Sequence, residues 1–301
     1  MKTALRSTSV PVSETAMLKL EAYWLLSKPR VTILVWLTTV AGLVLGGWGH
    51  PLGAGLVAAT LVGSWLVIAA ANALNQAYEW RQDALMPRTM HRPIPSGRIS
   101  PREGWLIGAV WGVLGTLVLA LWVNLSVAIL GAVSILLYAF AYTPLKQYSH
   151  FSTAIGAIPG AIPPMAGWVA AQGGFSIEAW VLFALQFVWQ FPHFWAIAWL
   201  YRDEYAKAGF HMLPYSDATA EATARLALWY TLAMVAISFM FAPFATQGWL
   251  YLLGAATLGL WVVRSAVRFV RNPDAPQSAR GVLMSSVLYL PLLLIWMILS
   301  V

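Results

Sequence analysis

Cysteine is absent from the 301-residue sequence, and charged residues make up only 10% of it. Without cysteine the chain cannot form disulfides, use a thiol nucleophile or hold a metal through thiolates. A soluble domain usually has about 25% charged residues, so this content is not that of an ordinary soluble protein. The net charge of +7 does not predict a nucleic-acid partner, because Lys and Arg in such an apolar chain mainly record membrane topology.

Apolar residues make up 60% of the sequence and gather in runs long enough to cross a lipid bilayer. The sequence therefore predicts an all-α, polytopic membrane protein with nine transmembrane helices. Residues 1–24 are expected to form a short, disordered cytoplasmic tail, and residues 25–301 a single transmembrane domain. The nine predicted spans are residues 31–48, 54–77, 104–123, 126–142, 153–171, 178–199, 225–244, 248–267 and 282–301.

The distribution of basic residues predicts the orientation of these spans. All 18 Lys and Arg lie before the first span or in and around alternate connections. The other connections, near residues 49–53, 124–125, 172–177 and 245–247, contain none. Since positive residues stay on the cytoplasmic side, we expect a cytoplasmic N-terminus and an external C-terminus. The first 20 residues do not form a convincing transit peptide, which favours a bacterial inner membrane.

A polar stretch at residues 72–98 follows the second span. Asn75, Glu79 and Asp83 occur at i, i+4 and i+8, which places them within about 80° on one helix face. Carboxylates gathered in this way can bind a hard divalent cation such as Mg²⁺. The basic residues that follow suggest an anionic, phosphate-bearing substrate. A solvated, salt-bridged helix end is the alternative, but the position beside a membrane-length apolar run favours a metal site.

A second polar region, residues 189–214, lies at the cytoplasmic end of span six. Two acidic helix ends that face each other across a bundle could hold Mg²⁺ bridging a diphosphate, because this ion needs only one or two carboxylates besides substrate phosphates. Lys146, alone in the loop after span four, is either a diphosphate contact or a lysine that extends to the membrane interface. The charged residues of the second region are Arg202, Asp203, Glu204 and Lys207.

A diphosphate bound at the end of an apolar bundle implies that a lipid tail lies inside the bundle. This arrangement is expected for a prenyl donor, whose allylic diphosphate leaves a carbocation when it ionises. Metal and basic side chains would stabilise the leaving group, and aromatic rings the cation. No charged side chain is predicted in the middle of a span, which argues against a transporter.

These motifs give the chain a specific family resemblance. It resembles the UbiA superfamily of intramembrane prenyltransferases, and RTMHRP and WQFPHFW resemble its haem-farnesylating branch. The segments that carry the resemblance are SKPRVT (27–32), NQAYEWRQDALMPRTMHRPIPSGRIS (75–100), YTPLK (142–146), IGAIPGAIPPMAGWVAA (155–171) and WQFPHFWAIAWLYRDEYAKAGFHMLP (189–214).

The resemblance implies a UbiA-type bundle with a cytoplasmic-side active site. It implies that farnesyl diphosphate alkylates a vinyl group of protohaem IX, that water adds, and that diphosphate leaves to give haem O. A haem A-forming enzyme and a terminal oxidase would then act downstream. Mg²⁺ is the implied cofactor. The implied metal ligands and catalytic residues are Asn75, Glu79, Asp83 and Asp203, with Glu204 as a further ligand; the implied diphosphate contacts are Arg88, Arg92, Lys146, Arg202 and Lys207.

Two departures from the family pattern affect these expectations. Glu79 stands where the superfamily often has Asp, and Lys207 stands where a second Asp would complete Asp-x-x-x-Asp after Asp203. His193 is expected to contact haem, as an axial ligand or otherwise; a buried, hydrogen-bonded histidine is the alternative. Two further functions remain open: prenylation of an aromatic or quinone precursor, and haem binding or transport without catalysis.

Overall fold

The computed structural model describes residues 12–213 and 219–301, and within these ranges every regular element is a helix. Nine of the described helices are long and apolar enough to cross a membrane, which confirms the predicted spans. The predicted and observed bounds differ most at the starts of the seventh and ninth spans. The spans are α2 (Pro29–Gly46), α3 (Ala54–Tyr78), α5 (Pro101–Trp122), α6 to α7 (Leu125–Leu145), α8 (Ser152–Gln172), α9 (Ile177–Leu200), α11 to η2 (Ala220–Phe244), α12 (Gly248–Arg271) and α13 (Pro276–Ser300).

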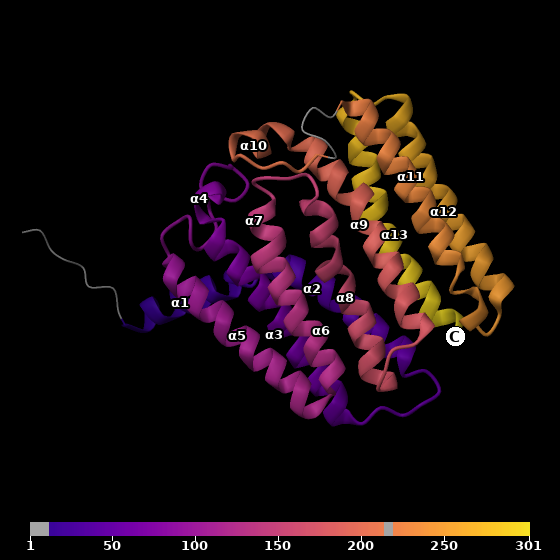
Figure 1. The fold of residues 1–301 in the computed structure, drawn as a ribbon, viewed down its shortest axis with the longest axis horizontal. Helices are drawn as coiled ribbons and strands as arrows, with labels where there is room; N and C mark the ends of the chain where they lie inside the picture. The colour runs from indigo at the N-terminus through magenta and orange to yellow at the C-terminus, as the bar shows by residue number, and fades with distance from the viewer. Residues whose placement is uncertain (1–11, 214–218) are drawn as a thin grey trace, which may run out of the picture.

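The helices form one bundle around α8, which is the most buried span: 72% of an 18-residue stretch of it lies inside the protein. Figure 1 shows α3, α5 and α6 on one side, α11 and α12 on the other, and α8 and α9 between them. The short helices α4 (Trp80–Asp83) and α10 (Arg202–Lys207) lie at the same end of the bundle, and the C-terminus lies at the opposite end (Figure 1). Both polar regions thus share one end, as the sequence predicted.

Glycines allow α2 and α8 to pack backbone against backbone. A Cβ added at Gly42 of α2 would clash with the carbonyl oxygen of Pro164, and one added at Gly167 of α8 would clash with the carbonyl oxygen of Thr39. Membrane helices commonly associate through small residues in this way, because lipid supplies little hydrophobic driving force between them. The contact fixes α2, and therefore the residue just before it, against the central helix.

Part of the segment expected to form a tail, residues 1–24, is helical in the structure. Helix α1 covers Val12–Leu26, whereas residues 1–11 lie outside the described part. Ala22 and Leu26 are fully buried in an apolar cluster, and the Tyr23 hydroxyl donates a 2.5 Å hydrogen bond to Glu103. The sequence suggested a tail because this segment is too short and polar to span a membrane. Burial of its few apolar side chains is enough to order it as a helix.

A π-helical segment, η1 (Leu137–Tyr142), interrupts the fourth span between α6 (Leu125–Leu136) and α7 (Thr143–Leu145). Single π-turns inside α-helices occur often at functional sites, because the wider turn changes which side chains face inward. Tyr138 and Tyr142 come from this segment, and Thr143 and Lys146 follow it. Their place in the bundle positions them around the first acidic motif.

Candidate active site at the polar end of the bundle

The acidic motif forms as its spacing predicted, although the helix is interrupted. Helix α3 ends at Tyr78, and α4 begins at Trp80. The i to i+4 hydrogen bonds continue across the break, since the amide of Glu79 donates to the Asn75 carbonyl at 2.9 Å and the amide of Asp83 to that of Glu79 at 2.8 Å. Asn75, Glu79 and Asp83 are 1%, 3% and 1% exposed. Two carboxylates are therefore buried together at the end of a membrane helix.

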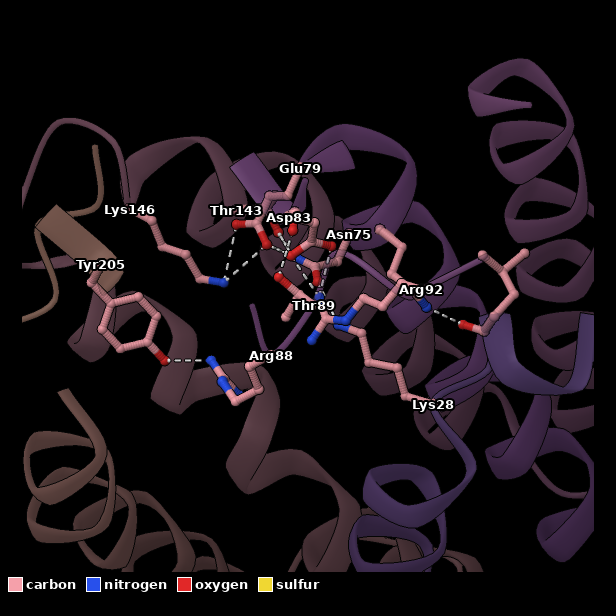
Figure 2. Close-up of polar contacts among 12 residues, drawn as sticks. Lys28, Asn75, Glu79, Asp83, Arg88, Thr89, Arg92, Thr143, Lys146 and Tyr205 are labelled. Atoms are coloured by element: carbon pink, nitrogen blue, oxygen red, sulfur yellow. Dashed lines mark hydrogen bonds and ion pairs between the residues drawn. The ribbon is translucent and has the colours of Figure 1, made fainter. Parts of the chain in front are cut away.

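Each buried carboxylate faces a basic side chain. Lys146 Nζ lies 3.1 Å from Oε1 of Glu79. Arg92 Nη1 donates to both oxygens of Asp83, at 2.8 and 2.7 Å. A buried carboxylate without such a partner would be strongly destabilising. The pairs also place two cations at the mouth of the bundle, where the leaving diphosphate is expected (Figure 2).

Asn75 links the acids to two further elements. Its Nδ2 donates to Glu79 Oε2 at 2.8 Å and to Thr143 Oγ1 at 3.0 Å. Its Oδ1 accepts a 2.6 Å hydrogen bond from Lys28 Nζ. In this state Asn75 orients Glu79, and its oxygen would become available to a metal only when Lys28 turns away. Figure 2 shows Lys28 and Lys146 reaching the cluster from different sides.

Lys28 has an unusual backbone. With φ 52° it is the one non-glycine residue with positive φ among those described, and it is the N-cap of α2, directly before Pro29. Such conformations cost free energy and occur preferentially at functional sites. Burial, and then repulsion from Arg92, lower the pKa of Lys28 to about 7. For Lys146 burial acts in the same direction, but the attraction of Glu79 outweighs it and raises the pKa.

Arg88 lies beside these cations and is held by aromatic side chains. Its Nη2 donates to the Tyr205 hydroxyl at 3.1 Å, and its guanidinium carbon lies 5.2 Å from the Tyr201 ring centroid and 5.8 Å from that of Tyr205. Tyr205 belongs to α10, so Arg88 connects the first polar region with the second (Figure 2). Arg88, Arg92, Lys28 and Lys146 together form a group of four cations around two carboxylates.

Below the cations a cavity of about 410 Å³ extends into the bundle. Glu79 and Arg92 line its polar end. Its apolar part is lined by residues of α2, α8 and α9 and by Ile68, which lies three turns or about 16 Å before Glu79 along α3. A cavity with a charged mouth and an apolar interior fits a molecule that has an anionic head and a hydrocarbon tail.

The first polar region fits a magnesium ion. No three acidic, His or Cys side chains gather into a metal-binding group anywhere in the described ranges. Mg²⁺ nevertheless needs only one or two carboxylates together with substrate phosphates. Glu79 Oε1 is buried and lies against Lys146 Nζ at 3.1 Å, so it would become a metal ligand when that lysine turns to the diphosphate. The donor set of Glu79, Asp83 and the Asn75 oxygen is composed of hard oxygens, as this ion requires.

The structure does not bring the second polar region into the cavity. Asp203 is 86% exposed, and its nearest cation is Arg202 at 4.0 Å. Of α10, only Tyr205 lines the cavity; Arg202, Asp203, Glu204 and Lys207 do not. The physical reason is that α9 ends at Leu200 and α10 lies over the end of the bundle with Asp203 at the surface (Figure 1). Their roles as metal or diphosphate ligands remain predictions that require α10 to move.

His193 does line the cavity, as expected of a haem contact. Its Nδ1 lies 3.0 Å from Ser286 Oγ, and its ring stacks on Trp189 with centroids 4.7 Å apart. The ring is hydrogen-bonded and also lines the cavity, so it is compatible both with a buried, hydrogen-bonded histidine and with a haem contact. Its role toward haem remains a prediction.

Several residues of the site were missed from sequence. Lys28 was counted only as a basic residue before the first span, although SKPRVT was among the motifs with a family resemblance. Thr143 lies within YTPLK, beside the lysine that was singled out. Gln186 and Gln190 are buried amides in span six, and their polarity within an apolar run was the available signal.

Comparison with known proteins places these features in context. A model of the UbiA prenyltransferase family matches residues 34–295. A protoheme IX farnesyltransferase of Solibacter usitatus is 42% identical over 276 residues, which cover 89% of this chain and 94% of that protein. Another, of Gloeobacter violaceus, is 41% identical over 281 residues, or 92% and 91% of the two chains.

Solved structures show the same fold at low sequence identity. Digeranylgeranylglyceryl phosphate synthase superposes with a TM-score of 0.77 and 17% identity, over 94% of this chain and 98% of that one. A UbiA homologue from Archaeoglobus fulgidus, bound to GPP and Mg²⁺, superposes with a TM-score of 0.60 and 14% identity, over 92% and 99%.

Proposed function

The chain belongs to the UbiA prenyltransferase family, and from this premise we propose that it farnesylates protohaem IX. It transfers the farnesyl group of farnesyl diphosphate to a vinyl carbon of haem b, water adds to the neighbouring carbon, and haem O and diphosphate are the products. Relatives about 40% identical over most of the chain carry the name of this activity. The observation that carries the proposal is the group of cations and buried carboxylates at the mouth of an apolar cavity.

The diphosphate binds at the mouth, where Lys28, Arg88, Arg92 and Lys146 surround the acids. In the structure Arg92 and Lys146 neutralise Asp83 and Glu79. When substrate binds, these two cations turn to the phosphate oxygens. As the bond to the farnesyl carbon breaks, negative charge accumulates on the leaving group. Cations already fixed at that position stabilise it without the reorganisation that water would require.

Mg²⁺ is the proposed cofactor, held by Glu79, Asp83 and Asn75. When bound, it supplies positive charge that neutralises the diphosphate and the carboxylates together. Before the ion binds, Lys146 and Arg92 balance the charge of the two carboxylates, and Mg²⁺ would take their place. A structural neighbour, a UbiA homologue bound to GPP and Mg²⁺, supports the choice of this ion. Asp203 and Glu204 would complete the site if α10 closes over the mouth.

The farnesyl tail and the haem occupy the apolar part of the cavity. Aromatic rings on its wall, including Tyr138, Tyr142 and Trp189, exclude water and present π faces to the allylic cation. His193, further along α9, contacts the haem side. The two substrates thus meet below the cations, and the carbocation forms where little solvent is present to quench it before the vinyl group attacks.

We further propose a bacterial inner membrane as the location, with the N-terminus and the polar mouth in the cytoplasm and the C-terminus outside. The alternation of basic connections supports this orientation. Haem O leaves into the membrane, where a haem A-forming enzyme or a terminal oxidase in assembly would receive it.

The decisive experiment uses the purified full-length chain in lipid nanodiscs with Mg²⁺, farnesyl diphosphate and haem b. Liquid chromatography with mass spectrometry should detect a haem heavier by a farnesyl group and one water, together with released diphosphate. Parallel reactions supply 4-hydroxybenzoate or a naphthoate in place of haem. Prenylation of those acceptors and not of haem would instead show a quinone-pathway enzyme. Haem binding without diphosphate release would show a non-catalytic haem protein.

A further inference from the structure

A row of three polar side chains crosses the apolar part of the cavity. Gln186, Gln190 and His193 occupy positions i, i+4 and i+7 of α9, which lie on one face of the helix, and all three line the cavity. The glutamines are 5% and 4% exposed. Burying an amide in such surroundings costs free energy unless all of its polar atoms are hydrogen-bonded.

Gln190 is fixed so that its oxygen remains free. Its amide nitrogen donates to the carbonyl of Ala157 at 2.9 Å and to that of Gln186 at 3.1 Å, which uses both of its protons. Its Oε1 lies against Gly160, where a Cβ would clash with it. The side chain is therefore anchored on the backbone of α8 and α9 and offers an acceptor only.

Gln186, one turn away, presents a second acceptor. Its Oε1 is buried and has no hydrogen-bond partner among the described residues. An orphaned buried acceptor beside a cavity is a position for a bound water, which needs two or more polar partners. The oxygens of Gln186 and Gln190 together provide them.

His193 supplies an acceptor of a different kind. The Ser286 hydroxyl donates to the Leu283 carbonyl at 2.7 Å, so its single proton is used. Ser286 Oγ must then accept from His193 Nδ1 across their 3.0 Å contact. This places the imidazole proton on Nδ1 and a lone pair on Nε2. Trp189 stacks on the ring and donates its Nε1–H to the Ser286 carbonyl at 2.7 Å, which fixes the same arrangement.

From this geometry we infer that Gln186 and Gln190 hold the water that completes the reaction and that His193 accepts its proton. The inference rests on the proposed function, in which attack of the vinyl group on the farnesyl carbon leaves a cation on the vinyl carbon next to the porphyrin. A water that shares one proton between the two amide oxygens and directs the other to His193 Nε2 presents a lone pair to that cation.

The step balances without another reactant. The water oxygen forms a bond to the cationic carbon, and the resulting oxonium loses one proton to His193 Nε2, leaving a neutral alcohol. Amide oxygens are too weakly basic to keep that proton, which is why an imidazole is needed beside them. Without an ordered water, the cation loses a proton from the adjacent carbon instead. The product is then an alkene, lighter by the mass of one water.

The test is the ratio of hydrated to dehydrated prenyl haem, measured by mass spectrometry with the full-length protein in nanodiscs. Gln186→Leu should lower this ratio by at least about tenfold while prenyl haem still forms. Gln186→Asn keeps the amide but moves its oxygen back, so it should lower the ratio less. This variant replaces Gln186→Leu in the test if the leucine variant does not fold. In ¹⁸O-labelled water, the remaining alcohol should carry the label. Gln172→Leu, the same change at the far end of α8, should leave the ratio unchanged.

A second pair of variants tests the imidazole. Ser286→Ala removes the acceptor that fixes Nδ1–H and should lower the ratio several-fold, whereas the adjacent Ser285→Ala, whose hydroxyl bonds to Val282, should not. An unchanged ratio in Gln186→Leu, or in Gln186→Asn and Ser286→Ala together, would overturn the inference. If the wild-type chain forms no prenyl haem at all, the proposed function itself is refuted. Failure of the inference and failure of the proposed function are thereby distinguishable.

Discussion

Lys146 and Glu79 form a buried ion pair, Nζ to Oε1 at 3.1 Å, that joins the end of α7 to the junction of α3 and α4. The lysine ammonium also lies 4.3 Å from the Tyr142 ring centroid, so an aromatic face supports it when it leaves the carboxylate. The pair keeps two buried charges neutral until ligands replace each of them.

Removing this lysine should impair diphosphate binding. Lys146→Met leaves Glu79 without its cation and the diphosphate without a ligand, so kcat/KM for farnesyl diphosphate should fall about 100-fold or more. Steady-state kinetics of diphosphate release measure it. Lys19→Met is the matched control, because Lys19 pairs with Glu103 at the surface, 3.4 Å away. Equal losses in both variants would show that the effect is not specific to the site.

The two acidic regions should differ in their contributions. Asp83→Asn removes a buried carboxylate of the cavity mouth and should reduce kcat about 100-fold or more. Asp203→Asn, on a side chain that is 86% exposed, should cost at least about tenfold less. Both are measured with saturating substrates. A larger loss in Asp203→Asn would mean that α10 carries the principal metal ligand.

Arg92 should tolerate replacement by lysine better than most functional arginines. One nitrogen, Nη1, makes both contacts with Asp83, so the guanidinium fork is not engaged there. Arg92→Lys should retain several-fold more activity than Arg92→Met. Arg225→Met, which breaks a surface pair with Glu221, controls for the loss of an arginine. If the Arg92→Lys and Arg92→Met variants are equally defective, the two-pronged guanidinium group itself contacts the diphosphate.

Activity should depend on a divalent metal. Treatment with EDTA should abolish diphosphate release, and Mg²⁺ should restore it. Glu79→Gln should shift the Mg²⁺ concentration for half-maximal activity upward by about tenfold, since the amide is a weaker ligand than the carboxylate. Metal titrations of the two proteins measure this shift. Full activity in EDTA would exclude the proposed role of Asn75, Glu79 and Asp83.

The α2–α8 contact should be sensitive to an added methyl group. Gly167→Ala places a methyl group on the Thr39 carbonyl and should lower the free energy of unfolding by about 1–3 kcal/mol. Gly55→Ala, at a helical position with open space around it, should be neutral or slightly stabilising. Thermal unfolding followed by tryptophan fluorescence compares them. Equal melting temperatures would show that α2 and α8 separate readily at this point.

Sequence patterns predicted the spans and the first motif well, because both depend on local periodicity. The length of apolar runs sets the helices, and the i, i+4 spacing sets the face that Asn75, Glu79 and Asp83 share. The hydrogen-bond ladder carries this face through the break between α3 and α4.

The remainder of the site depends on tertiary contacts that periodicity does not encode. Lys28 reaches Asn75 from a left-handed backbone conformation at the start of α2. Gln190 points inward because Gly160, on another helix, leaves room for its amide. The second acidic region failed to join the cavity because the direction of the chain after α9 is set by packing, not by the spacing of Asp203 and Glu204.

The glycine contact between α2 and α8 has a mechanical consequence. Gly42 and Gly167 bring the two backbones together, so the helices are expected to move as one rigid body. Lys28 lies at the start of α2, and Gly160, which contacts Gln190, belongs to α8. If the two helices move together, a displacement of the lysine when diphosphate arrives or departs would be transmitted to the interior of the cavity, and the leaving group would influence the hydration step without touching it.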